Sequence, residues 1–344
     1  MFEKYINKLI AGKNLSREEA MRAAIEIFHK ANPCQASAFL VLMRAKGETP
    51  EEILGVVDSM RSNMARLDLD FPVLDIVGTG GDRANTINIS TSAGILAASC
   101  GVKVAKHGNR SVSSKCGAAD ILEALGVNIK CTPRKTAECV KKVGFGFCFA
   151  PLFHPILAKL KGIRKELGIP TLFNILGPLL NPASAEYLMI GVFNEELAGF
   201  LADVITVSYQ PLPSNCIKKA LVFHSHGLDE LSCAFPATVI EVTPDGKKKY
   251  TLDSADYGFK RCKLEDLRGG TPDKNAKILK SVFEGAPGAA ANTIIFNAAV
   301  ALYIYGKTKS IEDAVSIAKK NVENGKASKT LKNLIELTKE NQNA

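Results

Sequence analysis

The sequence predicts an α/β protein with two unequal parts: a small N-terminal α-helical domain and a larger domain built on a mostly parallel sheet flanked by helices. The segment through about Leu67 shows apolar side chains at spacings of three and four, the period of helices. From residue 74 onward, short apolar runs alternate with helical runs, an order typical of parallel sheets. We therefore expect one domain at residues 1–67 and a second at residues 72–344.

The composition is that of an ordinary globular protein. Of 344 residues, 46% are hydrophobic and 23% are charged, which is enough apolar material for a buried core. No apolar run is long enough to span a membrane and the N-terminus lacks a signal-peptide pattern, so we expect a cytoplasmic protein without a membrane partner. Nine cysteines occur without a CxxC pair, which favours reduced core thiols over a zinc site or disulfides.

The net charge of +9 could indicate a nucleic-acid partner. However, the basic residues are spread along predicted helices. Their densest run, residues 247–249, follows Asp245 and Gly246, a pair that predicts a hairpin turn. A solvent-exposed face explains this distribution better than a nucleic-acid interface, so we expect no nucleic-acid partner. The same charge favours attraction of an anionic substrate.

The N-terminal part predicts four helices with clear start signals. Thr49 with Glu52, and Ser16 with Glu19, have the spacing of capping boxes, and Pro50 suits a first helical turn. A bundle this small has little core of its own, so we expect it to pack on the larger domain. The four helices are expected at residues 2–10, 16–30, 35–46 and 50–65.

A glycine-rich loop follows the first predicted strand, residues 74–77. Residues 78–82 read GTGGD, and glycines there permit positive φ, which turns successive N–H groups into one concave surface suited to phosphate oxygens. Ser90 or Thr91 can cap the helix that follows, so its positive dipole end would face the same loop. A single loop of this kind is also common as a plain tight turn.

A second loop of the same kind follows the next predicted strand, residues 102–105. Residues 106–114 read KHGNRSVSS, which adds two cations, an amide and hydroxyls, and a helix follows at residues 119–125. Ligands of parallel sheets bind at the carboxyl ends of the strands, so both loops predict one polyanion site. Neither a Walker loop nor the GxGxxG dinucleotide motif is present.

The rest of the chain continues the alternation. Residues 162–176 read as helical with an interruption at Pro170, and residues 208–217 read as a surface loop. Further strands are expected at residues 146–150, 188–192, 220–224 and 239–242. Further helices are expected at residues 133–143, 195–207, 274–283, 288–305, 311–324 and 327–340, and residues 151–155 lead into another helix that reaches about Leu160.

The two loops also carry a resemblance that extends over nearly the whole chain. Residues 78–82 (GTGGD), 88–91 (NIST) and 106–110 (KHGNR) resemble the anthranilate phosphoribosyltransferases. Later matches occur at residues 164–168, 171–179, 181–182, 227–230 and 269–272. The resemblance implies a nucleoside phosphorylase/phosphoribosyltransferase-like fold, and the KHGNR loop separates this family from the related pyrimidine nucleoside phosphorylases.

The resemblance implies transfer of the phosphoribosyl group from 5-phosphoribosyl 1-diphosphate (PRPP) to the amine of anthranilate, with release of diphosphate, in tryptophan biosynthesis. No residue is expected to act as an acid or base; Lys106 and Asn109 are expected to position the transition state by charge and hydrogen bonding. By resemblance, the donor-binding residues are Gly78, Thr79, Gly80, Gly81, Asp82, Thr86, Asn88, Ile89, Ser90, Thr91, Lys106, His107, Gly108, Asn109, Arg110, Ser113, Ser114 and Ala118.

The resemblance also assigns an acceptor site and a metal site. Arg164 is the candidate clamp for the anthranilate carboxylate, because a guanidinium matches a carboxylate bidentately. Mg²⁺ prefers oxygen ligands, and it is assigned to Ser90, Asp229 and Glu230. The other anthranilate-binding candidates are Gly78, His107, Asn109, His154 and Pro178.

The resemblance further implies a homodimer formed through the helical domain. It places part of residues 162–176 with that domain, so that a hinge would let the two domains close on substrate.

The sequence departs from the family pattern at several positions. Arg83 replaces a usual glycine, and Pro170 stands where an arginine is usual; the other departures are Cys116, Ala118, Ile156 and Gly162. Two alternative functions stay open: a pyrimidine nucleoside phosphorylase-like enzyme, and a nucleic-acid-binding relative of the same fold without the activity. The KHGNR loop and Arg164 disfavour the first, and the positive charge allows the second.

Overall fold

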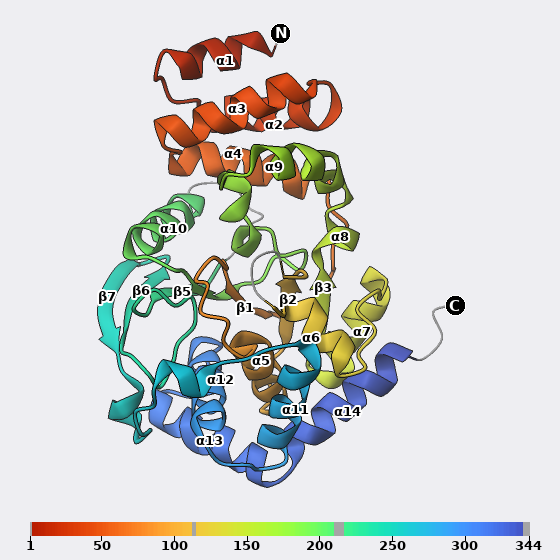
Figure 1. Ribbon diagram of the computed structural model, residues 1–344, viewed down its shortest axis with the longest axis vertical. Helices are drawn as coiled ribbons and strands as arrows, with labels where there is room; N and C mark the ends of the chain where they lie inside the picture. Colours follow the sequence, from red (N-terminus) through yellow and green to blue (C-terminus); the bar gives the residue numbers. More distant parts are fainter. Residues whose placement is uncertain (1, 112–114, 210–216, 340–344) are drawn as a thin grey trace.

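The computed structural model describes residues 2–111, 115–209 and 217–339. Figure 1 shows the N-terminal helices stacked at one end of the molecule, beyond a larger part in which helices surround a central sheet. This arrangement confirms the predicted combination of a helical bundle with an α/β part that has a mostly parallel sheet.

The N-terminal bundle consists of α1 (Glu3–Ile10), α2 (Arg17–His29), α3 (Pro33–Lys46) and α4 (Pro50–Arg61). Both predicted capping boxes form, at Ser16 with Glu19 and at Thr49 with Glu52, and Asn32 forms a third with Gln35. Helix α4 is shorter than expected, because it ends at Arg61 rather than near residue 65.

The segment after the third strand runs back to this bundle. It contains α8 (Ala150–Phe153), α9 (Lys161–Leu167) and the short 3₁₀ helices η1 (Pro155–Leu160), η2 (Leu172–Asn174) and η3 (Gly177–Leu179). Helix α9 and η2 both contact α3, and the ring of Phe173 lies 6.3 Å from that of Phe28 on α2. The expected helix over 162–176 is wrong beyond Leu167, since Gly168 takes the left-handed backbone (φ 63°) and ends α9.

The sheet has seven strands in the order β3-β2-β1-β4-β5-β6-β7. Neighbours from β3 to β5 are parallel, whereas β6 and β7 are antiparallel additions at one edge. The strands are β1 (Leu74–Gly78), β2 (Val104–Gly108), β3 (Phe145–Phe149), β4 (Tyr187–Gly191), β5 (Lys219–His224), β6 (Ala237–Thr243) and β7 (Gly246–Leu252).

One expectation about a strand end is wrong, and one about a turn is confirmed. Lys106, His107 and Gly108 are expected in a loop, but they form the end of β2, paired with β3 from Lys106↔Phe147 to Gly108↔Phe149. The hairpin turn predicted at Asp245 and Gly246 is present, because the antiparallel strands β6 and β7 are joined between Thr243 and Gly246. At Lys106 the pairing with β3 supplies backbone partners that local sequence patterns do not reveal.

The strand order places a topological switch point between β1 and β4. The chain leaves β1 and adds β2 and β3 on one side, then returns to add β4 and β5 on the other. Crossover loops therefore diverge at the carboxyl ends of β1 and β4, where open α/β sheets bind ligands. The loops that follow β1, β2, β4 and β5 all emerge at this edge.

The sheet separates two hydrophobic cores. Met189 of β4 lies in the core shared with the C-terminal helices, whereas its neighbours Leu188 and Ile190 lie in the core shared with the N-terminal bundle. Such alternation is what a strand covered on both faces requires. Helix α5 (Ile89–Ser99), buried against α12 and α14, covers the first face, and α10 (Glu195–Ser208) lies between the other face and α4.

The remaining helices are α6 (Ala118–Ala124), α7 (Pro133–Val143), α11 (Pro272–Phe283), α12 (Ala289–Ile304), α13 (Ile311–Glu323) and α14 (Lys326–Lys339), with the 3₁₀ helices η4 (Ser254–Tyr257) and η5 (Leu264–Leu267). Most of the expected loop at 208–217 lies outside the described residues. Among the helices that the structure describes, none is both long and apolar enough to cross a membrane.

Candidate active site

The first phosphate loop, residues 78–82, packs directly against Asp229. A methyl group built on Gly78 would lie 2.3 Å from Asp229 Oδ2, and one built on Gly191 would lie 1.8 Å from the Asp229 main-chain oxygen. The Gly80 N–H donates to Asp229 Oδ2 at 2.6 Å, and the Thr79 N–H donates to Gly191 O at 2.9 Å. Glycines at the ends of β1 and β4 therefore make room for this carboxylate at the switch point.

A tight turn presents Asp229 and Glu230 at this position. The main chains of Ser225 and Leu228 exchange hydrogen bonds of 3.2 and 2.9 Å, and His226 and Gly227 between them both have positive φ (48° and 89°). This is the geometry of a type I′ turn, in which glycine at the second position avoids strain. The turn ends β5 and aims the acidic pair back toward β1.

The two carboxyl groups repel one another in a buried environment. Burial, together with the charges of Glu230 and Asp82, holds the pKa of Asp229 well above its usual value. Burial also raises the pKa of Glu230 to about 7, although the charge of Lys106 opposes this. Closely spaced acidic oxygens of this kind fit a divalent cation, because the cation removes the repulsion.

The protein alone does not complete a metal-coordination sphere in the part of the chain that is described. No group of three or more His, Cys, Asp or Glu side chains there is arranged to hold a metal ion. A magnesium ion commonly keeps several waters and shares substrate phosphate oxygens, so an incomplete protein ligand set suits that metal. Ser90, the third expected ligand, lies beside the pair: its N–H donates to Glu230 Oε1 at 3.2 Å.

Lys106 brings a buried cation next to these acids. Its side chain is 3% exposed; Nζ donates to the main-chain oxygen of Ile76 and lies 3.4 Å from Ser90 Oγ. Burial lowers the pKa of Lys106, while Asp75, Glu230 and Asp229 oppose that shift. The Lys106 ammonium therefore lies between β1 and β2 in a buried environment, where its electrostatic attraction for a polyanion would be strong.

Helix α5 begins differently from the expectation. Ser90 and Thr91 were expected as caps, but both lie inside the first turn, and Asn88 precedes the helix without a side-chain cap bond. The Asn88 amide instead bonds within the protein: Nδ2 donates to Cys116 O at 2.9 Å and Oδ1 accepts from Asn275 Nδ2 at 2.9 Å. Ile89 is completely buried, so its side chain belongs to the core.

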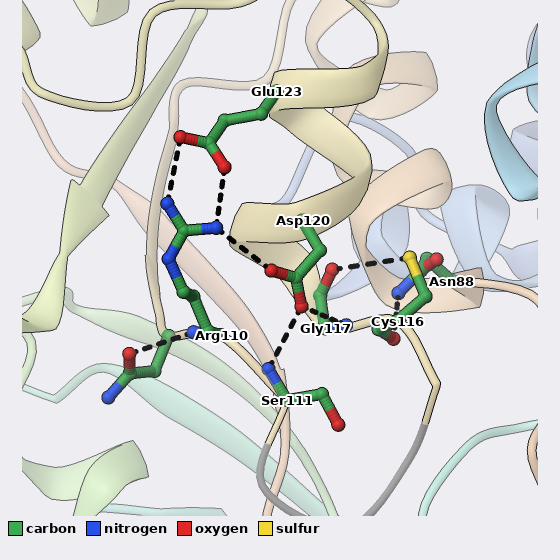
Figure 2. A network of polar contacts seen from close by, with 8 residues as sticks. Asn88, Arg110, Ser111, Cys116, Gly117, Asp120 and Glu123 are labelled. Carbon is green, nitrogen blue, oxygen red and sulfur yellow. Dashed lines mark hydrogen bonds and ion pairs between the residues drawn. The ribbon is translucent and has the colours of Figure 1, made fainter. Parts of the chain in front are cut away.

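The segment between β2 and α6, residues 109–117, contains the second phosphate loop, and Asp120 bonds it on either side of residues 112–114, which lie outside the described residues (Figure 2). Asp120 Oδ2 accepts from the N–H groups of Ser111 at 3.0 Å and Gly117 at 2.8 Å. Arg110 turns toward α6, where it binds Asp120 at 3.0 Å and Glu123 at 2.5 Å. Arg110 is thus engaged in an exposed ion-pair network, and Ser113 and Ser114 lie outside the described residues.

The other donor candidates lie around these loops. Asn109 is exposed and its Oδ1 accepts from the Arg110 N–H at 2.8 Å. Ala118 begins α6, and a methyl group built on Gly108 would lie 3.3 Å from its Cβ. Thr86 pairs with Arg268 in an isolated antiparallel bridge. Asp82 Oδ1 accepts from the Ala84 N–H at 3.2 Å.

Two acceptor candidates, His107 and His154, form a buried pair with ring centroids 5.0 Å apart. His107 Nδ1 bonds Gly177 O at 3.1 Å and His154 Nε2 bonds Leu180 O at 2.8 Å, so each of these nitrogens carries the proton. The opposite nitrogens have no partner within the described residues. Burial lowers the pKa of His107 to about 3 and that of His154 to about 4, so both rings are neutral near pH 7.

The acceptor candidate Arg164 lies on α9, its guanidinium carbon is 5.6 Å from the centre of the Phe173 ring, and burial lowers its pKa. Among the described residues, Arg164 forms no ion pair. Pro178 is buried in η3, next to the Gly177 carbonyl that binds His107. The acceptor candidates thus come from both the sheet edge and the segment on the bundle.

Sequence reasoning missed a buried carboxylate beneath the site. Asp75 accepts from the His107 N–H at 3.1 Å and from Asn181 Nδ2 at 2.7 Å, and Asn181 also donates to Ala105 O at 2.7 Å. Burial raises the pKa of Asp75 to about 6. An aspartate inside the apolar run 74–77 was the available signal, since a charge on a buried strand needs partners.

At one departure from the family pattern, Arg83, the backbone shows why glycine is the usual residue. Arg83 has φ 56°, in the left-handed region where glycine is favoured, so the arginine there is strained. Nothing in the structure explains Pro170, which is exposed between α9 and η2.

Comparisons with known proteins agree with this geometry. The family model described as the glycosyl transferase family α/β domain matches residues 70–328, and the helical bundle domain of the same family matches residues 3–64. The anthranilate phosphoribosyltransferase of Chlamydia felis is 43% identical over 331 residues, which cover 96% of this chain and 95% of that protein.

Solved structures of the same family are also similar to this chain. The crystal structure of anthranilate phosphoribosyltransferase from Thermus thermophilus superposes with a TM-score of 0.89 at 37% identity, covering 97% of this chain and 99% of that one. The Saccharomyces cerevisiae enzyme in complex with PRPP and Mg gives a TM-score of 0.88 at 29% identity, covering 98% and 97%. The same yeast enzyme has also been solved with 4-fluoroanthranilate. The chain therefore belongs to the anthranilate phosphoribosyltransferases, the pentosyltransferases of tryptophan biosynthesis.

Proposed function

We propose that the edge of the sheet at the β1–β4 switch point binds PRPP with Mg²⁺ and transfers its phosphoribosyl group to anthranilate. The observation that carries this proposal is the convergence of a glycine loop, a helix N-terminus, a buried lysine and an acidic pair at one point. The yeast relative with PRPP and Mg supports the choice of ligands.

The donor would lie along the two loops. Its diphosphate would take the main-chain donors of residues 78–82 and the hydroxyl of Thr91, and its ribose and 5-phosphate would face Lys106, Asn109 and the second loop. When bound, Mg²⁺ would neutralise charge on the departing diphosphate, held by Ser90, Asp229 and Glu230. Asn88 and Arg110 also bond protein groups, so as donor-binding residues they would fix the shape of the loops as well.

Anthranilate would lie between the sheet edge and the segment on the bundle. Arg164 would hold its carboxylate, with Gly78 and Asn109 on the amine side and Pro178 beside the ring. His107 and His154 are neutral, so they would shape the pocket and would not act as bases at pH 7. The amine needs no base before attack, since positive charge on the ribose carbon makes the weak nucleophile sufficient once it is positioned.

We further propose the division into residues 1–67 with part of 162–176, and 72–344. The contacts of α9 and η2 with α3 support it. The bundle would also form a homodimer, which is supported by apolar side chains exposed on α1 and α3: Ile10 is 65% exposed and Val41 is 38% exposed. A cytoplasmic location is proposed from the biosynthetic role of the family.

The test is a fluorescence assay that follows the loss of anthranilate with PRPP and Mg²⁺. We expect turnover that needs all three, and Arg164→Ala should raise the anthranilate KM at least about tenfold, because a charged hydrogen bond is lost. PRPP binding measured by calorimetry should stay close to wild type in that variant. Turnover without Mg²⁺, or equal loss of donor and acceptor affinity in Arg164→Ala, would contradict the assignment.

A further inference from the structure

Two amides, the buried Asn275 and the half-buried Asn88, link the C-terminal part of the sequence to the start of α5 and to Cys116. Asn275 lies in the first turn of α11 and is 1% exposed. Its Oδ1 accepts from the Gly270 N–H at 2.8 Å, and its Nδ2 donates to Asn88 Oδ1 at 2.9 Å. Asn88 Nδ2 in turn donates to Cys116 O at 2.9 Å, a contact shown in Figure 2.

Each link has a fixed direction. Asn88 uses its oxygen toward Asn275 and its amino group toward Cys116, so it cannot reverse without facing one carbonyl oxygen with another. Asn275 likewise uses its oxygen toward Gly270 and its amino group toward Asn88. The orientation of Asn275 therefore dictates that of Asn88, and Asn88 fixes the position of the main chain at Cys116.

The segment that carries Asn275 is also hydrogen-bonded to residues 85–87, which lie between the first loop and α5. The Ile87 N–H donates to Leu267 O and the Gly269 N–H donates to Asn85 O, both at 2.9 Å. A methyl group built on Gly269 would lie 2.7 Å from Thr86 O and 2.8 Å from Asn275 Oδ1. Only glycine permits this approach, so residues 267–275 form a brace along residues 85–88.

We propose that Asn275 is a positioning residue for the donor site, which acts through Asn88 to hold the start of α5 and the Cys116 end of the second phosphate loop in one geometry. This rests on the proposed function. Asn275 does not contact the donor: it is buried behind Asn88, and both polar ends of its amide are bound by protein groups. Its contribution is pre-organisation, which lowers the ordering cost of binding PRPP.

The direct test is Asn275→Asp. An ionised aspartate has no donor, so one of its oxygens faces Asn88 Oδ1. If Asn88 turns over to avoid this, its own oxygen faces Cys116 O, and one of the links is lost in either case. We expect the PRPP KM and the PRPP dissociation constant to rise about tenfold or more, with the anthranilate KM within about twofold of wild type.

Asn275→Ala removes the same bonds without adding charge, and it reports the effect if the aspartate variant does not fold. The matched control is Asn321→Ala, another buried amide, whose Nδ2 bonds Cys100 Sγ at 2.8 Å. Cys100 follows the other end of α5, an 11-residue helix about 16 Å long. The control should lose comparable thermal stability and leave the PRPP KM unchanged.

Donor binding by calorimetry needs no acceptor, so it tests Asn275 separately from turnover of anthranilate. The proposal is overturned if both Asn275 variants bind PRPP with Mg²⁺ as wild type does. It is also overturned if they weaken PRPP and anthranilate equally, or if Asn321→Ala weakens PRPP as much. Wild-type protein that binds PRPP without consuming anthranilate would refute the proposed function alone, whereas wild-type protein that does not bind PRPP would refute both.

Discussion

The two phosphate loops hold their shape by different means. The first loop is fixed by close packing: the main chain of β1 and β4 meets Asp229 so tightly that Gly78 and Gly191 have no room for a Cβ. The second loop is fixed by side-chain hydrogen bonds, from Asp120 on either side of residues 112–114 and from Asn88 at Cys116. A side chain added where there is no space forces the main chain to move, whereas the loss of one of several hydrogen bonds leaves the others in place. The first loop should therefore tolerate far less substitution than the second.

The sharpest way to break the first loop is Gly191→Ala. The added methyl group would lie 1.8 Å from Asp229 O, so β4 or the Asp229 turn must move, at an expected cost of at least about 2 kcal/mol of unfolding free energy. Activity should fall by more than about a hundredfold because the acidic pair shifts. Urea unfolding and the anthranilate assay measure the two effects.

The matched control is Gly199→Ala in α10, where an added Cβ meets nothing within 4 Å. That change should leave activity intact and leave stability unchanged or raised by up to about 1 kcal/mol. If Gly191→Ala behaves like the control, the close-packing account of the first loop is wrong.

Acid should loosen the strand that leads into the second loop. His107 and His154 have pKa values lowered to about 3 and about 4 by burial, against about 6.5 in the unfolded chain. Their stabilising effect is therefore complete above pH 6.5 and is lost as the pH falls toward the folded values. For His154 alone the loss between pH 7 and pH 5 is roughly 2 kcal/mol.

Measuring the free energy of unfolding at pH 7 and at pH 5 checks this prediction. His154→Gln keeps a neutral polar side chain and should show a smaller drop in unfolding free energy on acidification than wild type. An equal drop in both proteins would mean that His154 does not carry the acid sensitivity.

Asp120→Asn should weaken the second loop without breaking it. The amide oxygen can take the place of Oδ2 and accept both N–H bonds from Ser111 and Gly117, but a neutral acceptor binds them more weakly than a carboxylate does, and the charge that binds Arg110 is lost. We expect a loss of about 1 kcal/mol and a fall of about tenfold in kcat/KM for PRPP. Steady-state kinetics with PRPP varied at saturating anthranilate measures it, and an unchanged kcat/KM would remove Asp120 from the support of this loop.

Glu123→Gln should have the smallest effect, although it removes a shorter ion pair from the same helix. The side chains of Arg110 and Glu123 are 46% and 37% exposed, and exposed pairs typically contribute about 0.2 to 1 kcal/mol. Thermal melts and PRPP kinetics should stay near wild type. A large loss would show that Arg110, rather than Asp120, holds the second loop.

The local signals in the sequence anticipated much of the fold. The capping boxes at Ser16 and Thr49, and helices such as α7, lie where expected, because caps and apolar periodicity are decided by neighbouring residues. Failures came where distant partners decide the outcome. Lys106 joined a strand because β3 pairs with it, and the residues beyond Leu167 left the helical pattern at Gly168.

For the site, the sequence by itself determined the family motifs, the glycine loop and the acidic pair, because these residue types have few other uses in such a pattern. Only the tertiary structure decided which of these side chains are bound by other protein groups. It turned Arg110 toward Glu123, bound Asn88 to Asn275, and placed Asp75 beneath His107. The physical reason is that polar groups of a folded chain find their partners wherever the fold brings them, and the partner of Asn88 lies 187 residues away in the chain.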